Sequence, residues 1–186
     1  MSERIHVATR KGLFTVACRA AGWSVSRTAF LGDPVVMVLH DACDDHVYAA
    51  IKHGHFGNML HRSADGGAIW EQVEPPAYPS RPEGAEPVMC PVRNIEIPWN
   101  LEMVWELRPD LRSDGALWCG TIPGGLFHSG DRGRTWRLVE SLWNDEARRK
   151  WSGGGYDYPG IHSILVHPRC SESDRRGCFV RGRVDQ

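Results

Sequence analysis

The chain has 186 residues, of which 41% are hydrophobic and 24% charged, and its formal net charge is −1. A chain of this length fits one globular domain, and so small a net charge excludes the long-range attraction that basic proteins have for nucleic acid or anionic membranes. Eight Trp, 20 Gly and 12 Pro indicate many turns between strands with large aromatic side chains, which is typical of all-β proteins. We therefore expect no nucleic-acid partner and no membrane partner.

The amino terminus lacks the pattern of a signal peptide. Charged residues fall where such a peptide has its apolar core, and no apolar run approaches the ~20 residues that cross a membrane. The six cysteines show neither a C-x-x-C pair nor a regular spacing. The sequence thus predicts a cytoplasmic protein with reduced thiols.

Short strands recur along the chain in a fixed order. Strands with small and aromatic residues are predicted at 5–9, 47–51 and 117–121, and each is followed by a Gly-containing turn and a further strand. More apolar strands that end in a turn are predicted at 35–41, 103–109 and 162–168. The repeating unit therefore has four short strands, and we expect the fourth to begin at a Trp.

Self-comparison supports this unit. A shift of 66 residues superposes identical residues at six of fourteen positions, from Leu60 on Leu126 to Val73 on Val139. A shift of 113 residues aligns a Gly-Leu-Phe at 12–14 with a second one and places Trp23 on Trp136. Four antiparallel strands in about 40 to 50 residues are typical of a β-propeller blade. We predict an all-β fold, namely an incomplete β-propeller of four-stranded antiparallel blades.

The predicted partial propeller covers residues 1–168, with about three blades and part of a fourth. Its blade parts are expected at about 4–26, 35–73, 103–139 and 162–168. Residues 169–186 form an atypical Arg-rich tail, in which only 177–180 imitates a second strand. Because a propeller typically closes with four to eight blades, this loss of pattern indicates a truncated or frame-disrupted product of a longer gene. The alternative is a naturally short chain that self-associates through its open blade edges.

Two related octets, SADGGAIW at 63–70 and SGDRGRTW at 129–136, mark the turn before the fourth strand. The Asp of each can accept hydrogen bonds from backbone N–H groups of its own turn, and the Gly two residues later permits a positive φ. The Trp then fills the blade as a large apolar side chain. In the first copy Cys18 stands in place of the Asp. We expect a structural role for Ser63, Asp65, Gly67, Trp70, Ser129, Asp131, Gly133 and Trp136.

The octets resemble the Asp-box, or BNR repeat, with the pattern S-x-D-x-G-x-T-W. The second octet matches fully, and the first has Ile69 where Thr is usual. With HGHFGNMLHRSADGG, LWCGTIPGGLFHSGDRG and WSGGGYDYPGIHSI, the chain from residue 4 to about 168 is similar to bacterial sialidase-like β-propeller proteins labelled glycosyl hydrolase or exo-α-sialidase. The resemblance implies the propeller fold and, as an activity, hydrolysis of a glycosidic bond.

A binding site is expected on the face opposite the Asp-boxes. The turn between the second and third strands and the crossover to the next blade lie on that face, and the crossovers 74–102 and 140–161 are unusually long. The expected binding residues there are Arg10, His53, His55, Trp99, Asn100 and His162. Because first strands line the central channel of a propeller, we expect Glu102 at its mouth, with a solvated loop residue as the alternative.

The crossover 140–161 runs into WSGGGYDYPGIHS. Three glycines allow close approach of the backbone, and Tyr156, Asp157, Tyr158 and His162 combine rings, a carboxylate and an imidazole, as in a sugar site. Glycosidases usually need two carboxyl groups, and sialidases use a Tyr in place of one. The candidate catalytic residues are therefore Asp157, Glu102 and Tyr156. The alternative is a Gly-Pro turn that braces the next blade.

The HGH sequence at 53–55 raises another hypothesis, which is metal binding. If the segment is extended, His53 and His55 share one side and could bind a metal ion with His40, His162 or Asp157 as third ligand. Isolated H-x-H is weak evidence, and hydrogen-bonded loop histidines are the alternative. We expect no metal and no cofactor.

Two functions fit the sequence. The first is a glycoside hydrolase of unknown substrate, although Glu96 stands where a sialidase has the Arg of its Arg-Ile-Pro segment. The second is a noncatalytic propeller that binds a glycan, small molecule or protein on the face opposite the boxes. No nucleophile elbow, P-loop, dinucleotide fingerprint or zinc spacing indicates another chemistry.

Overall fold

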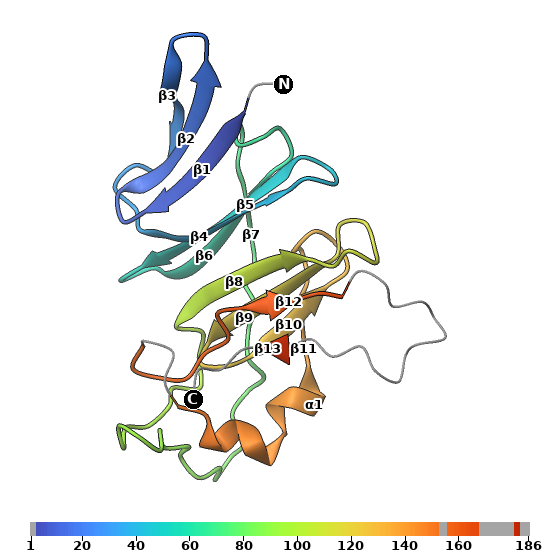
Figure 1. Cartoon of the computed structure of the whole chain (residues 1–186). Helices are drawn as coiled ribbons and strands as arrows, with labels where there is room; N and C mark the ends of the chain where they lie inside the picture. Colours follow the sequence, from blue (N-terminus) through green and yellow to red (C-terminus); the bar gives the residue numbers. More distant parts are fainter. Residues whose placement is uncertain (1–2, 153–155, 168–180, 183–186) are drawn as a thin grey trace. The chain divides into compact units, whose positions relative to one another are not determined.

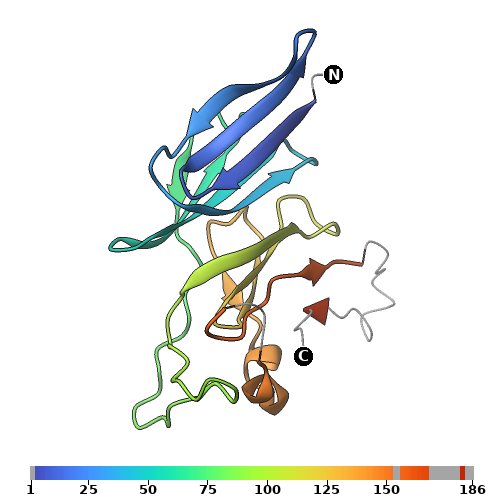
Figure 2. The same cartoon turned by 60° about the vertical axis from the view of Figure 1, so that its left-hand side comes forward.

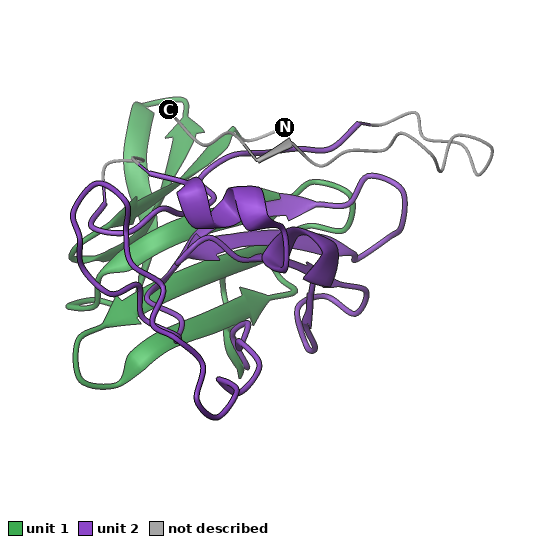
Figure 3. Cartoon of the chain, turned by 90° about the horizontal axis from the view of Figure 1, so that it is seen from below, with its two compact units in different colours: residues 1–73 green, residues 74–186 purple. Residues whose placement is uncertain are grey.

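The structure of the protein, a computed structural model, describes residues 3–152, 156–167 and 181–182 (Figure 1). The chain divides into two compact units, Met1–Val73 and Glu74–Gln186 (Figure 3). Each unit is described by itself.

Unit 1 consists of strands joined in sequence order into two antiparallel sheets (Figure 2). Its strands are β1 (Arg4–Thr9), β2 (Gly12–Arg19), β3 (Gly22–Ala29), β4 (Val35–Asp41), β5 (His46–His53), β6 (Gly57–Ser63) and β7 (Glu71–Val73). The first sheet has the order β1-β2-β3, and the second has the order β4-β5-β6-β7. In the described part of the chain β1 pairs with β2 alone, so the first sheet lacks the apolar first strand of a complete four-stranded unit.

The two sheets of unit 1 share one hydrophobic core. Leu13 of β2 packs there with Val35 of β4 and with Ala49 and Ile51 of β5. Strand β5 is buried at five consecutive residues, 47–51, which fits a central strand covered on both faces. Strand β3 is exposed along almost its whole length because it lies at the edge of its sheet.

Unit 2 repeats the four-stranded sheet and adds short helices. Its elements are β8 (Met103–Pro109), β9 (Leu117–Ile122), β10 (Leu126–Ser129), β11 (Arg137–Leu138), α1 (Glu140–Trp143), the 3-10 helix η1 (Glu146–Lys150), β12 (Ile164–Leu165) and β13 (Arg181–Gly182). The sheet order is β11-β10-β9-β8, and β12 pairs with β13. A second core is formed by Leu126, Ile161 and Ile164.

The prediction of an all-β, incomplete β-propeller with sequential four-stranded sheets is confirmed. Strands β4 and β8 begin and end at the predicted residues, whereas β7 and β11 begin one residue after the box Trp. The crossover 140–161 contains α1 and η1, which we did not predict, and Asp145 caps η1 by accepting a hydrogen bond from the Ala147 N–H (2.8 Å). The predicted strand 162–168 shortens to β12, and the imitation strand at 177–180 lies outside the described residues.

Both box turns have the hydrogen bonds that their sequences predict. In the first, Asp65 Oδ1 accepts from Ser63 Oγ (2.6 Å) and from the N–H groups of Ala68 and Ile69 (2.8 and 2.9 Å). The Gly67 N–H donates to Ser63 Oγ (2.8 Å), and φ of Gly67 is +89°, in the left-handed region. The turn is thus closed by its own side chains.

The second box turn has an additional side-chain donor, the hydroxyl group of Thr135. Asp131 accepts from Ser129 Oγ (2.8 Å) and the Thr135 N–H (2.9 Å), and also from Thr135 Oγ1 (2.6 Å). Burial acts to raise the pKa of Asp131, but the bonds from Thr135, Ser129 and the backbone of Arg134 outweigh it and lower the pKa to about 2. In the first copy, where Cys18 replaces the Asp, β2 and β3 are joined by the two residues Ala20 and Ala21 alone.

Candidate functional site

The first strand of unit 2, β8, contains a β-bulge at Trp105. Val104 pairs with Thr121 and Glu106 pairs with Gly120, so Trp105 is the extra residue between them. A bulge bends its strand and changes the direction of a side chain, and bulges are over-represented next to active sites. Trp105 remains partly exposed, whereas Val104 is buried.

Two glycines let the end of the long crossover lie against this bulge. A Cβ at Gly120 would clash with the Ile161 carbonyl oxygen, and one at Gly160 would come within 2.7 Å of the Trp105 ring. The Ile161 N–H also donates to the Thr121 carbonyl (3.1 Å). The end of the crossover can therefore pack this closely on the strands only because Gly120 and Gly160 have no side chain.

Partly exposed rings of β8 and of the crossover end at 156–162 therefore lie together. The ring centroid of Trp105 lies 5.3 Å from that of His162 and 6.3 Å from that of Tyr156. Tyr158 follows at 6.3 Å from Tyr156. We call Trp105, Glu106, Tyr156, Tyr158 and His162 the bulge site. Of the predicted residues, the structure brings Tyr156, Tyr158 and His162 together.

Glu106, like Trp105, is a residue of this site that was not predicted from the sequence. It is 8% exposed and forms an ion pair with Arg108 of the same strand. Burial raises the pKa of Glu106, while the positive charges of Arg108 and His162 act to lower it. The sequence signal was a Glu between Trp105 and Leu107 in the mainly apolar β8. A carboxyl group with a raised pKa keeps its proton to a higher pH and can therefore act as a proton donor.

The other predicted catalytic residues have different partners. The Asp157 carboxylate forms an ion pair with Arg93 at 2.9 Å, and its side chain is 61% exposed. Glu102 accepts a hydrogen bond from the Asn100 side chain at 3.0 Å. Glu102 lies four residues before Glu106, or roughly 13 Å along an extended strand. Gly153, Gly154 and Gly155 lie outside the described residues.

Trp99 braces the crossovers of unit 2. Its Nε1–H donates to the Pro79 carbonyl (2.7 Å), and its ring centroid lies 5.5 Å from that of Trp143. Tyr78 packs on the same Trp143 at 4.9 Å and makes a 2.6 Å hydrogen bond to Thr121. The long crossover 74–102 is therefore fastened to α1 and to β9.

The three predicted binding residues of unit 1 lie near the turns at one end of its sheets. Arg10 is exposed in the β1–β2 turn. His53, the last residue of β5, lies 3.7 Å from Asp33 and packs on Phe56. His55 is in the turn after β5, so the HGH segment is not extended and the condition for a shared side of His53 and His55 is not met. Within the described residues no group of three or more His, Cys, Asp or Glu could hold a metal ion.

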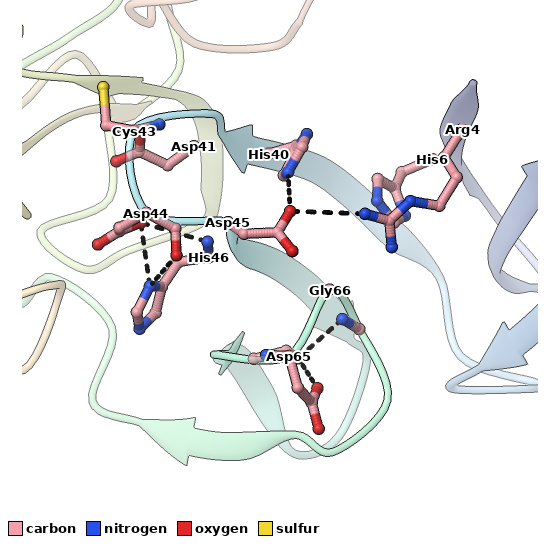
Figure 4. Close-up of polar contacts among 12 residues, drawn as sticks. Arg4, His6, His40, Asp41, Cys43, Asp44, Asp45, His46, Asp65 and Gly66 are labelled. Carbon is pink, nitrogen blue, oxygen red and sulfur yellow. Dashed lines mark hydrogen bonds and ion pairs between the residues drawn. The ribbon is translucent and has the colours of Figure 1, made fainter. Parts of the chain in front are cut away.

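Polar side chains also gather around the first box turn, on the face that was not expected to bind a ligand (Figure 4). Asp45 lies between His40, whose Nε2 is 2.7 Å from Oδ1, and Arg4, whose Nη2 is 3.6 Å away. Arg27 donates to the Gly66 carbonyl at 3.1 Å. Beside the second box turn, an open concavity of about 340 Å³ is lined by Asp131 and neighbouring residues.

The cysteines in the described part of the chain are free thiols, as expected: Cys18, Cys43, Cys90 and Cys119. Among the helices of the described residues, none is long and apolar enough to cross a membrane.

The comparisons with known proteins support the fold alone. No protein-family model and no curated protein sequence matches the chain. Among solved structures it is similar to a GH74 xyloglucanase from Xanthomonas campestris, with 14% sequence identity and a TM-score of 0.52. The match covers 89% of this chain and 23% of that chain, so the chain spans about a quarter of the length of the enzyme it resembles.

Proposed function

We propose that the chain contributes a carbohydrate site to a sialidase-like, Asp-box β-propeller that hydrolyses a glycosidic bond. The observation that carries this proposal is the bulge site, where the partly exposed rings of Trp105, Tyr156 and His162 pack together and the charge of His162 acts on the buried Glu106. Sugar rings bind through apolar faces that stack on aromatic side chains, with a few polar groups that fix their orientation. The likeness to a xyloglucanase supports the same class of ligand.

Glu106 would serve as the general acid. Its raised pKa keeps the carboxyl group protonated over a wider pH range, so that it can donate a proton to the oxygen of the leaving sugar. His162 and Arg108 would then stabilise the carboxylate that remains, because both carry or can carry a positive charge beside it. Tyr156 and Trp105 would hold the sugar rings.

Hydrolysis needs a second carboxyl group about 5 to 10 Å from the acid. Asp157 is the better candidate, because it adjoins Tyr156, whose ring packs on Trp105. Glu102 is less suitable because it lies roughly 13 Å from Glu106 along the strand. In this role Asp157 would act as base or nucleophile, and its ion pair with Arg93 would hold the carboxylate in place.

A noncatalytic glycan-binding propeller is the second candidate. The ion pair between Asp157 and Arg93 at 2.9 Å favours this candidate. The guanidinium balances the negative charge of the carboxylate that would have to act as base or nucleophile in hydrolysis. In that case Trp105 and Tyr156 bind a glycan without turnover.

The test is turnover of a panel of aryl glycosides by the chain and its variants. Glu106→Gln should lower kcat by about 100-fold or more while KM changes little, because general acid catalysis contributes that much. Asp157→Asn should also lose activity, whereas Glu102→Gln should retain it. Saccharide binding without turnover would assign the noncatalytic function. Turnover that is unchanged in Glu106→Gln and Asp157→Asn would refute the assigned roles.

A further inference from the structure

A second, separate site is present in unit 1, where three arginines line one concavity. This arginine pocket has an open volume of about 220 Å³ and is lined by Arg4, Thr15, Ala17, Arg19, Ser26 and Arg27. All six residues belong to the sheet β1-β2-β3. The site therefore lies within one unit and has no residue in common with the bulge site.

The strand register explains why the arginines converge. Arg4 pairs with Ala17 and Thr15 pairs with Arg27, so these side chains lie on one face of the sheet. Arg19 is two residues from Ala17 on β2 and shares that face. On β3 the register shifts between the pairs Thr15–Arg27 and Val16–Val25, which leaves Ser26 as an extra residue of a bulge.

The floor and the rim of the pocket differ in polarity. Thr15 and Ala17 are buried, with 5% and 6% exposure, and form the floor. Arg19, Ser26 and Arg27 are exposed at the rim, and the Arg4 side chain is 38% exposed. No Asp or Glu is among the lining residues. Positive charge is thus concentrated here, although unit 1 has seven Lys and Arg and seven Asp and Glu in total.

The nearest acidic groups are already engaged. Asp45 accepts from His40 at 2.7 Å and lies 3.6 Å from Arg4. Asp65 accepts the hydrogen bonds of its own box turn. Within the described residues Arg27 makes one hydrogen bond, to the Gly66 carbonyl at 3.1 Å, and a guanidinium has five N–H donors. Arg27 therefore keeps donors that can bind an acceptor from solution.

Burial and nearby positive charges, those of the arginine pocket included, lower the pKa of His6. Burial lowers the pKa of His6, and the positive charges of His40, Arg4 and Arg27 lower it further, against the opposing effect of Asp45. His6 also holds the floor in place, since its Nδ1 is 3.1 Å from Thr15 Oγ1.

We infer that the arginine pocket binds a tetrahedral oxyanion, and specifically a phosphate monoester. Three guanidinium groups from three strands suit a group with three terminal oxygens and a charge of about −1.5 to −2 at neutral pH. A carboxylate has only two oxygens and is satisfied by one guanidinium. Because the pocket is open to solvent, the esterified part of the ligand extends outward. This site is independent of the proposed glycosidase function.

The experiment titrates the 186-residue chain with a sugar phosphate monoester and, separately, with inorganic phosphate and acetate, at constant ionic strength. Backbone and arginine Nε–H signals are followed by NMR. The expected result is saturable shifts of Thr15, Arg19 and Arg27 with both phosphates, and weaker effects with acetate. Tighter binding of the monoester than of inorganic phosphate identifies the ester as ligand; equal or weaker binding overturns that part of the inference.

Arg19→Ala is the deciding variant, because Arg19 is exposed and its side chain has no hydrogen bond or ion pair within the described residues. It should weaken phosphate binding by about tenfold, the value of one charged hydrogen bond. Arg19→Lys should bind with intermediate affinity because it keeps the charge but loses the planar pair of donors. Lys11→Ala, an exposed control outside the pocket, should bind as the parent does.

The competing explanation is that the arginines have a structural role alone, in which they connect the first sheet to the first box turn through bonds such as that of Arg27 to the Gly66 carbonyl. In that case Arg27→Ala would lower the unfolding temperature, but neither Arg27→Ala nor Arg19→Ala would change any phosphate response. The absence of saturable shifts with both phosphates at tens of millimolar would overturn the inference. Equal responses to acetate and phosphate would do the same, because they would show charge screening alone.

Discussion

Replacement of Asp131 by Ala should destabilise unit 2 by about 1 to 2 kcal/mol without affecting ligand binding at the bulge site. The carboxylate accepts hydrogen bonds from Ser129 Oγ and from the N–H and Oγ1 of Thr135, at 2.6 to 2.9 Å, and also from the backbone of Arg134. Ala removes all of them. Thr135 is exposed, so water can replace part of the loss, which places the cost in the lower half of the usual range for lost hydrogen bonds.

The pKa of Asp131 gives a second measure of the same contribution. It falls from the ordinary 3.8 to about 2, because the hydrogen bonds outweigh the opposing effect of burial. A shift of that size corresponds to at most ~2.5 kcal/mol, and solvent screening at this partly exposed turn reduces it to about 1. Since the folded pKa is the lower one, this stabilisation is present above about pH 4 and is lost as the pH falls towards 2.

The assay is urea unfolding followed by Trp fluorescence, which reports mainly on unit 2. Six of the eight tryptophans lie in that unit: Trp99, Trp105, Trp118, Trp136, Trp143 and Trp151. Asp114→Ala is the matched control, because Asp114 is an exposed turn residue of the same unit. The reasoning is refuted if Asp131→Ala costs no more than Asp114→Ala, or if the difference does not shrink between about pH 6 and pH 3.

Three further outcomes follow from local geometry. Gly133→Ala should cost about 1 to 2 kcal/mol because φ is +75°, whereas Gly130→Ala should be close to neutral since a Cβ there meets nothing within 4 Å; equal thermal unfolding of both would contradict this. Tyr78→Phe should cost about 1 to 2 kcal/mol by removing the 2.6 Å bond to Thr121, and unchanged urea unfolding would be the contrary result. The pKa of His6 lies below its ordinary 6.5, so the unfolded chain binds more protons and stability should decrease as the pH falls through 6.5; His6→Gln should flatten that dependence in denaturation measured at several pH values.

Local chemistry made much of the fold predictable. The apolar strands β4 and β8 were placed correctly because each is a short apolar run bounded by turn residues. The box turns were predictable because the donors that bond to Asp65 and Asp131 lie within a few positions of each Asp. Interactions of this short range are encoded in consecutive residues and need no knowledge of the rest of the fold.

The bulge site was only partly predictable, because it depends on contacts between distant segments. Tyr156 and His162 could be named from their segment, but their neighbour Trp105 lies about fifty residues earlier. A bulge has no fixed sequence signature, so the pattern of β8 did not distinguish Glu106 from a solvent-facing residue. Trp99 was predicted as a binding residue from its place before a first strand, and its packing on Trp143 of the next crossover could not be predicted because it joins distant segments.

The measurement that tests the proposed carbohydrate site most directly is an NMR titration of the indole Nε1–H signals with a panel of oligosaccharides. The signal of Trp105 should shift saturably with at least one saccharide, and Tyr156→Ala should weaken that response by about tenfold. Trp23, in unit 1, should not respond to the same ligand. If no saccharide shifts the Trp105 signal, or if Trp23 responds equally, the bulge site is not a carbohydrate site.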